Sequence, residues 1–113
     1  MKLTRCVAGA LAATLMASAA SADVTDGVVK IGVLTDMSGT YSDLSGAGSA
    51  WAAKKAAEDY AKINPNLKVE IVSADHQNKA DISANTARQW YDVDKVDVIV
   101  DLVTSSTALA VNQ

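Results

Sequence analysis

Four consecutive hydroxyl side chains, Thr104-Ser105-Ser106-Thr107, follow a β-branched apolar run and precede the start of a helical pattern at Ala108. Hydroxyls and free backbone N–H groups at the start of a helix can hold a carboxylate, because both donate hydrogen bonds to an anion. A helix cap alone needs only one such residue. The run therefore favours a ligand-binding turn over simple N-capping.

A second polar segment, residues 35–46, follows the first apolar run of the chain and is rich in serine, threonine, aspartate and glycine. Such a cluster is typical of a loop. Tyr41 is its only aromatic residue. Its ring can stack on or fence a ligand held by the hydroxyl run, or it can pack within the loop.

Nucleotide binding and phosphoacceptor chemistry are both disfavoured. Gly46-Ala47-Gly48 begins a glycine fingerprint, but Trp51 stands where the third small residue belongs, so packing at a helix start is the simpler interpretation. Asp36 and Asp101 lie near the ends of two predicted strands, as in cytoplasmic receiver domains, yet the N-terminus predicts export. Asp36 is therefore expected to cap a turn.

Metal and nucleophilic chemistry find equally little support. His76 is the only histidine, and Asp75 beside it does not complete a metal-ligand set. We expect His76 in a solvated loop or on the rim of a ligand cleft. No G-x-S-x-G elbow is present, and His76 has no serine partner at a recognisable spacing.

Residues 1–22 have the build of a secretory signal peptide. Lys2 and Arg5 precede a short apolar run from Cys6, and Ala20-Ser21-Ala22 supplies the small residues of a cleavage site. Cleavage after Ala22 would leave a cysteine-free, acidic chain, which suits the bacterial periplasm and excludes a basic nucleic-acid surface. No internal feature predicts a metal or a cofactor.

The remaining chain alternates strands and helices, which is the pattern of a parallel βαβαβ unit of the α/β class. Right-handed crossovers would place the first strand in the middle and the two full helices on opposite faces. Ligands then bind beyond the carboxyl ends of the strands. The expected strands are 28–34, 67–73 and 96–103; the expected helices are 46–63, 81–93 with Asp81 as N-cap, and one starting at 108; residues 74–80 are expected to form a loop.

Three stretches carry a resemblance to a known family: KIGVLTDMSGTYSDLSGAGSAWAAKKAAED, VEIVSADHQNKADISANTARQWYD and VDVIVDLVTSSTALAV. The chain resembles periplasmic solute-binding proteins of the leucine/isoleucine/valine-binding type, which serve ABC importers. Met37-Ser38-Gly39 and the hydroxyl run are the most specific elements. The segments DHQNKAD and RQWYDVDKVDVIVD resemble those of family members that bind aromatic or other organic acids.

The resemblance implies a two-lobed protein that closes on a small carboxylate and has no enzymatic activity. Thr104, Ser105 and Ser106 would hold the carboxylate, and Tyr41 and Asp43 would line the rest of the ligand. Residues 23–113 would form an incomplete N-terminal lobe of the type I fold without the second lobe, and a membrane permease would be the partner.

Two other classes stay open at this level. The same fold serves as an extracellular ligand-sensing receptor domain, and a small α/β hydrolase or transferase fragment would show the same element order. The outer strands of a three-stranded sheet would also leave unpaired edges, which predicts partial unfolding or self-association.

Overall fold

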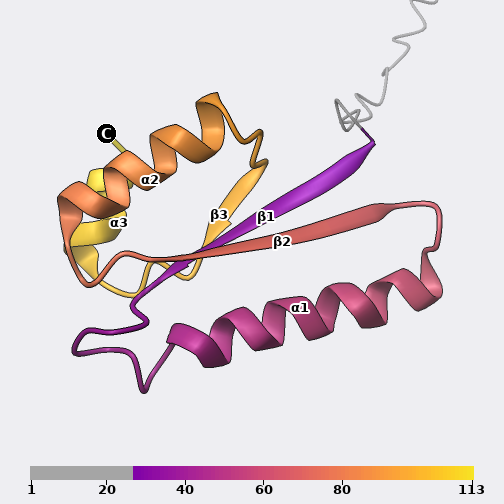
Figure 1. Ribbon diagram of the computed structural model, residues 1–113, viewed down its shortest axis with the longest axis horizontal. Helices are drawn as coiled ribbons and strands as arrows, with labels where there is room; N and C mark the ends of the chain where they lie inside the picture. The colour runs from indigo at the N-terminus through magenta and orange to yellow at the C-terminus, as the bar shows by residue number, and fades with distance from the viewer. Residues whose placement is uncertain (1–26) are drawn as a thin grey trace, which may run out of the picture.

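The computed structural model describes residues 27–113, so the predicted signal peptide, with its cleavage site and Cys6, lies outside the described residues. The structure alternates three strands with three helices (Figure 1). The strands are β1 (Val28–Thr35), β2 (Lys68–Asp75) and β3 (Val98–Val100). The helices are α1 (Gly46–Ile63), α2 (Ala80–Asp92) and α3 (Ser105–Val111).

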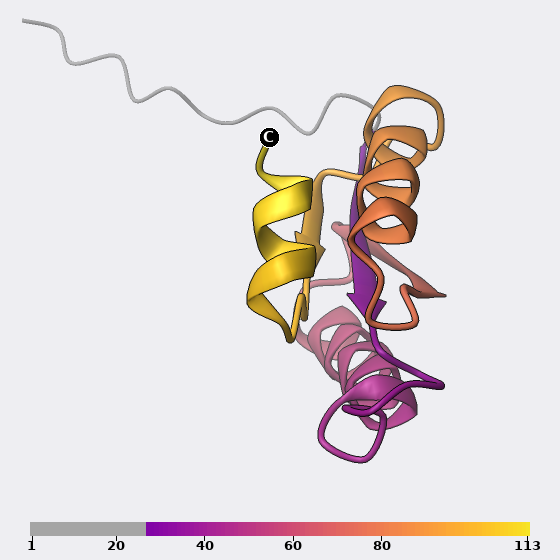
Figure 2. The ribbon, with the colours of Figure 1, turned by 90° about the vertical axis from the view of Figure 1, so that its left-hand side faces the viewer.

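The three strands form a parallel sheet in the order β2-β1-β3, which confirms the predicted α/β class and the central place of β1. β1 pairs with β2 over its whole length, from Val28 opposite Lys68 to Thr35 opposite Asp75. β3 pairs only with Ile31–Val33. Helix α1 covers one face of the sheet, while α2 and α3 pack against each other on the other face (Figures 1 and 2).

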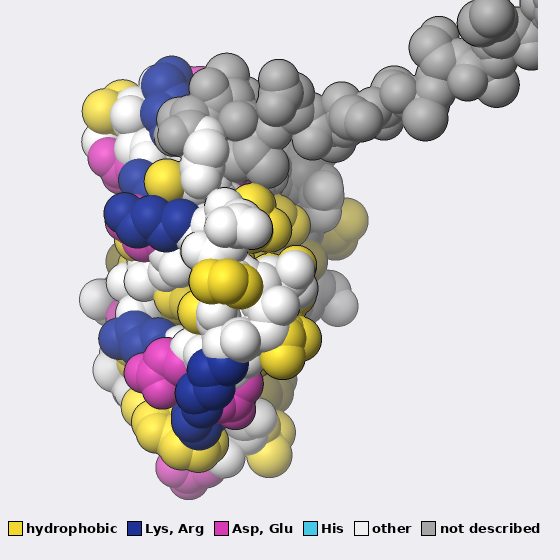
Figure 3. All heavy atoms as spheres, turned by 90° about the vertical axis from the view of Figure 1, so that its right-hand side faces the viewer, with side chains coloured by type: hydrophobic (Ala, Val, Ile, Leu, Met, Phe, Trp, Pro, Cys, Tyr) yellow, Lys and Arg dark blue, Asp and Glu magenta, His cyan; other side chains and the backbone are white. Residues whose placement is uncertain are grey.

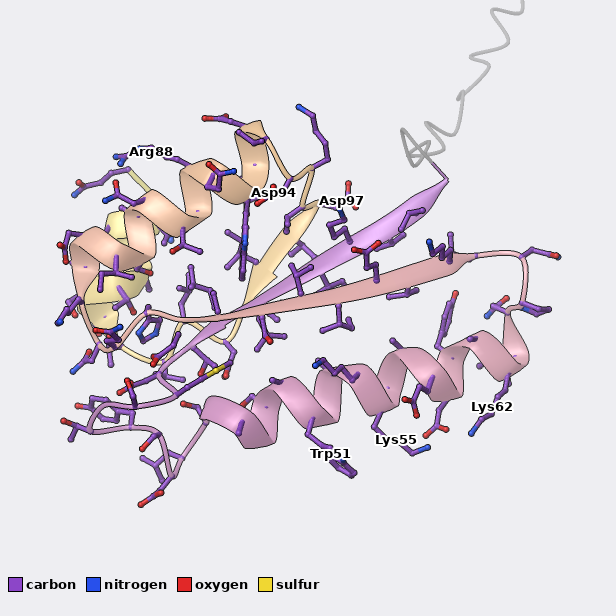
Figure 4. All side chains as sticks on the ribbon, in the orientation of Figure 1. Trp51, Lys55, Lys62, Arg88, Asp94 and Asp97 are labelled. Atoms are coloured by element: carbon purple, nitrogen blue, oxygen red, sulfur yellow. The ribbon has the colours of Figure 1, made fainter. Side chains whose placement is uncertain are left out.

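The third strand is much shorter than predicted. Val96 donates its N–H to Trp90 O at 2.9 Å, a bond to the last turn of α2 and not to the sheet. The left-handed backbone of Asp101, φ 67°, interrupts the extended chain after Val100. Between these points Asp97 ties the connection to β1, since its Oδ2 accepts the N–H of Lys30 at 2.7 Å (Figure 4).

The helix starts also differ from the prediction. Lys79 occupies the N-cap position of α2, and no side chain caps this helix, so the prediction of Asp81 as N-cap was wrong. Asp81 lies in the first turn, where its carboxylate faces the positive end of the helix dipole. Helix α3 begins at Ser105 and not at Ala108, which places most of the hydroxyl run inside the helix.

The hydrophobic core lies between the sheet and the α2/α3 face. Leu34 of β1 packs with Ala87, Trp90 and Val96, all of them buried. Trp90 lies directly on the backbone of Gly32, where an added Cβ would come 2.5 Å from Trp90 Cε3. Glycine at this position therefore lets the largest core side chain reach the central strand.

The α1 face is less complete. A groove of about 550 Å³ runs between α1 and the sheet, and its lining is apolar. The alanines of α1, Ala53, Ala56 and Ala57, bring the helix close to the strands but cover little of them. Its outer side carries Trp51, Lys55 and Lys62, which point away from the sheet (Figure 4).

Charges of opposite sign lie together on this outer side. Asp59 accepts hydrogen bonds from Lys55 at 3.1 Å and Lys62 at 2.6 Å. Viewed from the end of the molecule opposite the β1–α1 loop, basic and acidic side chains lie next to one another (Figure 3). Within residues 27–113, none of the helices combines the length and hydrophobicity needed to cross a membrane.

Candidate ligand-binding edge

The carboxyl ends of the three strands define one edge of the sheet, which we call the carboxyl edge (Figure 1). It consists of residues 36–45 after β1, 76–79 after β2 and 101–107 after β3. Because the strands are parallel, these segments emerge side by side, and both predicted ligand-binding segments lie among them. Open parallel sheets bind their ligands at such an edge.

Asp36 organises the loop after β1. Its carboxylate is fully buried, with Oδ1 accepting the N–H of Gly39 at 2.7 Å and Oδ2 that of Tyr41 at 3.0 Å. A Cβ at residue 39 would lie 2.6 Å from both carboxylate oxygens, so the turn needs glycine there. Asp36 is thus the turn cap that the sequence predicts, and both of its oxygens are occupied by the loop.

Asp75 holds the same loop from the neighbouring strand. Its Oδ1 accepts the N–H groups of Met37 at 2.9 Å and Gln77 at 2.8 Å, and its Oδ2 accepts the Ser38 hydroxyl at 2.6 Å. Partial burial works to raise the pKa of Asp75, but the hydrogen bonds from Ser38, Met37 and Gln77 outweigh it and hold the pKa below its ordinary value.

This role of Asp75 was missed, because the sequence prediction ended β2 at Ser73 and left Asp75 in a polar loop. The signal that reveals it is the register. Asp75 lies opposite Thr35, the last residue of β1, and therefore next to the start of the loop.

His76 lies inside the molecule, so the prediction of a solvated or rim position was wrong. The side chain is fully buried. The backbone N–H of His76 continues the ladder with β1 by donating to Thr35 O at 2.8 Å. The ring Nδ1 accepts the backbone N–H of Asn78 at 3.0 Å. Nε2 is buried without a partner among the described residues. In the same part of the chain, no three His, Cys, Asp or Glu residues are grouped to hold a metal.

The hydroxyl run divides into an inner and an outer part. Thr107 is fully buried and donates its hydroxyl to Thr104 O at 2.9 Å, while the two threonine hydroxyls lie 2.9 Å apart. Ser105 and Ser106 are exposed at the carboxyl edge. Thr104 precedes α3 without capping a backbone N–H. The threonines therefore brace the turn, and the serines are the hydroxyls open to a ligand.

Tyr41 and Asp43 are both exposed in the loop after β1. The carbonyl of Tyr41 accepts the N–H groups of Leu44 at 3.0 Å and Ser45 at 3.2 Å, so the backbone is fixed while the ring stays accessible. No hydrogen bond within residues 27–113 joins this loop to the hydroxyl run. The two segments share the edge as separate elements, each on its own strand.

Gly46, at the start of α1, serves packing as the sequence predicts. It has φ 62° and donates its N–H to Thr35 Oγ1 at 3.1 Å. A Cβ there would lie 2.8 Å from Asp36 O. The apolar groove beneath α1 is a different place and, with its apolar lining, offers little to bind a carboxylate.

Comparison with known proteins identifies the family. The family model described as periplasmic binding protein matches residues 28–113. A periplasmic binding protein from Burkholderia mallei is 47% identical, with a TM-score of 0.71, over 77% of this chain and 23% of that chain. A branched-chain amino acid ABC transporter periplasmic ligand-binding protein from Burkholderia xenovorans LB400 is 49% identical, with a TM-score of 0.68, over 74% and 22%.

A third solved structure, an ABC transporter solute-binding protein from R. palustris in complex with benzoate, is 25% identical with a TM-score of 0.57, over 75% of this chain and 23% of that chain. No curated protein sequence matches the chain. The chain spans less than a quarter of the length of these solved relatives. Their family consists of substrate-binding transport proteins and is not an enzyme family. The chain belongs to the periplasmic binding protein family, as its sequence motifs predict and the match over residues 28–113 confirms.

Proposed function

We propose that this chain supplies one wall of a binding site for a small carboxylic acid, an amino acid or an aromatic acid, in the exported substrate-binding component of an ABC importer. The observation that carries the proposal is the family match over residues 28–113, which includes the whole carboxyl edge. The exposed hydroxyls of Ser105 and Ser106 at this edge supply the donors that a carboxylate needs.

The roles at the site follow from exposure and bonding. Ser105 and Ser106 donate to the ligand carboxylate, and Thr104, braced by Thr107, fixes the turn on which they stand. Tyr41 and Asp43 line the remainder of the ligand from the clamped loop after β1. This division uses fixed backbone on both segments, which lowers the entropy cost of ordering the site on binding.

The chemistry of the relatives supports this ligand class. The Burkholderia xenovorans relative is described as a branched-chain amino acid ABC transporter protein, and the R. palustris relative holds benzoate. Both ligand types carry a carboxylate and differ in the rest of the molecule. We therefore assign the shared carboxylate to the hydroxyl run, and the second lobe and the membrane permease to the remaining length of such a protein.

A chimera tests the proposal. Residues 28–113 replace the matching segment of the Burkholderia xenovorans relative, and calorimetry measures binding of a panel of amino and aromatic acids. We expect binding of at least one acid. Ser105→Ala should weaken it tenfold or more, because hydrogen bonds to charged groups contribute about 1.5–3 kcal/mol.

Ser73→Ala is the matched control, since Ser73 is an exposed serine in the interior of β2. This change should alter the affinity by less than about twofold, in line with ordinary surface substitutions. A folded chimera that binds no acid of the panel, or an unchanged affinity in the Ser105→Ala variant, would contradict the proposal.

A further inference from the structure

We propose that Asp75 is a positioning residue for the ligand-binding loop, 37–41, which it locks to the end of β2. The inference rests on the proposed function in one respect, namely that this loop forms part of the ligand wall. Asp75 itself is not placed against the ligand. Its effect passes through the backbone of Met37 and Ser38 to Tyr41.

The hydrogen bonds show how the lock works. Asp75 accepts hydrogen bonds from Met37 N at 2.9 Å and from Ser38 Oγ at 2.6 Å. Met37 and Ser38 are the first two residues after Asp36. Asp36 accepts from the next part of the loop, at Gly39 and Tyr41. Two carboxylates therefore hold successive parts of one short loop.

The two anchors are not equivalent. Asp36 belongs to the segment that leaves β1, so it can fold the loop on itself but cannot fix the loop against the rest of the sheet. Asp75 ends the neighbouring strand, in register with Thr35. It alone of the two ties the loop to a second strand, and so it sets the direction in which the loop leaves the sheet.

The bonds of Asp75 are of the stronger kind, because an ionised acceptor shortens and strengthens a hydrogen bond. The direction of its pKa, below the ordinary value, agrees with a carboxylate that the folded chain keeps ionised. A bond of 2.6 Å to Ser38 Oγ lies at the short end of the range for hydroxyl donors.

A simpler role must be separated from this one. Asp75 also accepts the N–H of Gln77 at 2.8 Å, where the backbone has φ 53°, and this bond alone would make it a cap of the turn into α2. The two roles differ at Gly39 and Tyr41. Their N–H groups bind Asp36, so they respond to loss of Asp75 only if Asp75 orders the loop as a whole.

Amide hydrogen exchange, followed by NMR on the 113-residue chain, makes this distinction without any ligand. Asp75→Ala should speed exchange at Gly39 and Tyr41 at least tenfold, while Leu34 in the core changes less than twofold. Asp75→Asn should restore much of the protection, because its amide oxygen can still accept from Met37 and Gln77. Faster exchange at Gln77 with unchanged rates at Gly39 and Tyr41 would overturn the proposal.

Two further variants complete the design. Asp92→Ala is the control, since Asp92 is exposed and its side chain makes no hydrogen bond within residues 27–113; it should leave the loop unchanged. If Asp75→Ala also speeds exchange at Leu34, Ser38→Ala decides, because it removes a single bond. A larger increase of the exchange rate at Gly39 and Tyr41 than at Leu34 in the Ser38→Ala variant supports the lock, and an equal increase at all three residues overturns it.

The chimera links the lock to binding. Asp75→Ala should weaken binding of the acid at least fivefold, and Asp75→Asn should recover most of the loss. A chimera that binds no acid would refute the proposed function, while the exchange experiment would still decide the lock. Normal binding by the Asp75→Ala chimera with a loosened loop would refute the positioning role alone.

Discussion

The two faces of the sheet are built to different degrees. On the α2/α3 face, Trp90 reaches the backbone of Gly32, and Leu34 is fully buried. On the α1 face, alanines leave an apolar groove of about 550 Å³. Burial also differs along β1, because its first four residues are half-buried and its last four are buried. The part of the sheet that is best packed therefore leads directly into the carboxyl edge.

This arrangement suits a binding site, because side chains that meet a ligand need rigid support. The loop after β1 leaves the buried end of its strand and is held by Asp36 and Asp75. The open groove lies to the side of the edge, beneath α1. Substitutions on the α2/α3 face should thus change stability and ligand binding, and substitutions on the α1 face should change self-association.

The two tryptophans give the largest expected difference between the faces. Trp90 is 8% exposed in the core, and Trp51 is 68% exposed on the outer side of α1. Trp90→Ala should lower the free energy of unfolding by about 3–5 kcal/mol. Trp51→Ala should change it by no more than about 0.5 kcal/mol. Urea unfolding measures both, and comparable losses would contradict the contrast.

Self-association is expected to depend on the open face. Val100 lies on β3, an edge strand of the described sheet, and lines the groove with 38% of its surface exposed. Val100→Lys should shift the chain toward monomer in sedimentation velocity, because a charged residue on an edge strand discourages pairing between sheets. The free energy of unfolding should fall by about 1 kcal/mol, the typical cost of a single substitution.

Val93→Lys is the matched control, because Val93 is 61% exposed at the end of α2 and away from the groove. It should leave association unchanged. A wild-type chain that stays monomeric and unfolds in one sharp urea transition would show that the edge and the groove do not drive association.

The smallest effect expected is the pH dependence of the Asp75 lock. Its pKa is lower in the folded chain than in the unfolded one, so the carboxylate stabilises the fold above the unfolded value and loses this contribution as pH falls through the folded value. Because the unfolded pKa is about 3.9, this stabilising contribution is lost only below about pH 4. Because Asp75 is partly solvated, the effect should stay below about 1 kcal/mol.

Amide chemical shifts of Met37 and Gln77, followed from pH 7 down to about pH 2, measure this lock directly. Both should move together in the wild-type chain, and Asp75→Asn should remove the transition. A wild-type transition with its midpoint at or above the ordinary aspartate pKa of about 3.9 would contradict the assignment of the lock to a carboxylate that the fold keeps ionised.

Much of the fold follows from local pattern. The bounds of α1 were predicted correctly, because the helical spacing of alanines continues to Ala61 and Pro65 prevents the helix from continuing. The order β2-β1-β3 follows from the handedness of crossovers. The length of β3 could not be predicted, since the mostly β-branched residues of the expected strand 96–103 do not reveal that Asp101 adopts a left-handed backbone.

The candidate site was predictable in outline only. Tyr41, Asp43, Thr104, Ser105 and Ser106 were chosen from residue type and resemblance, and their roles stay predictions. Thr107 braces the turn because it is buried, and Asp75 holds the loop after β1 because two distant segments pair in this register. Tertiary contacts of this kind leave no periodic signal in the sequence, which is also why the burial of His76 was missed.

The central claim is that the carboxyl edge recognises a carboxylate. The most direct test is an NMR titration of the 113-residue chain with benzoate and, in parallel, with its uncharged isostere benzamide. We expect benzoate to shift the amides of Thr104–Ser106 with a Kd of about 1 mM or weaker, corresponding to about −4 kcal/mol for one wall of a site, and benzamide to leave them in place. Equal shifts with both compounds, or shifts confined to the groove beneath α1, would contradict the claim.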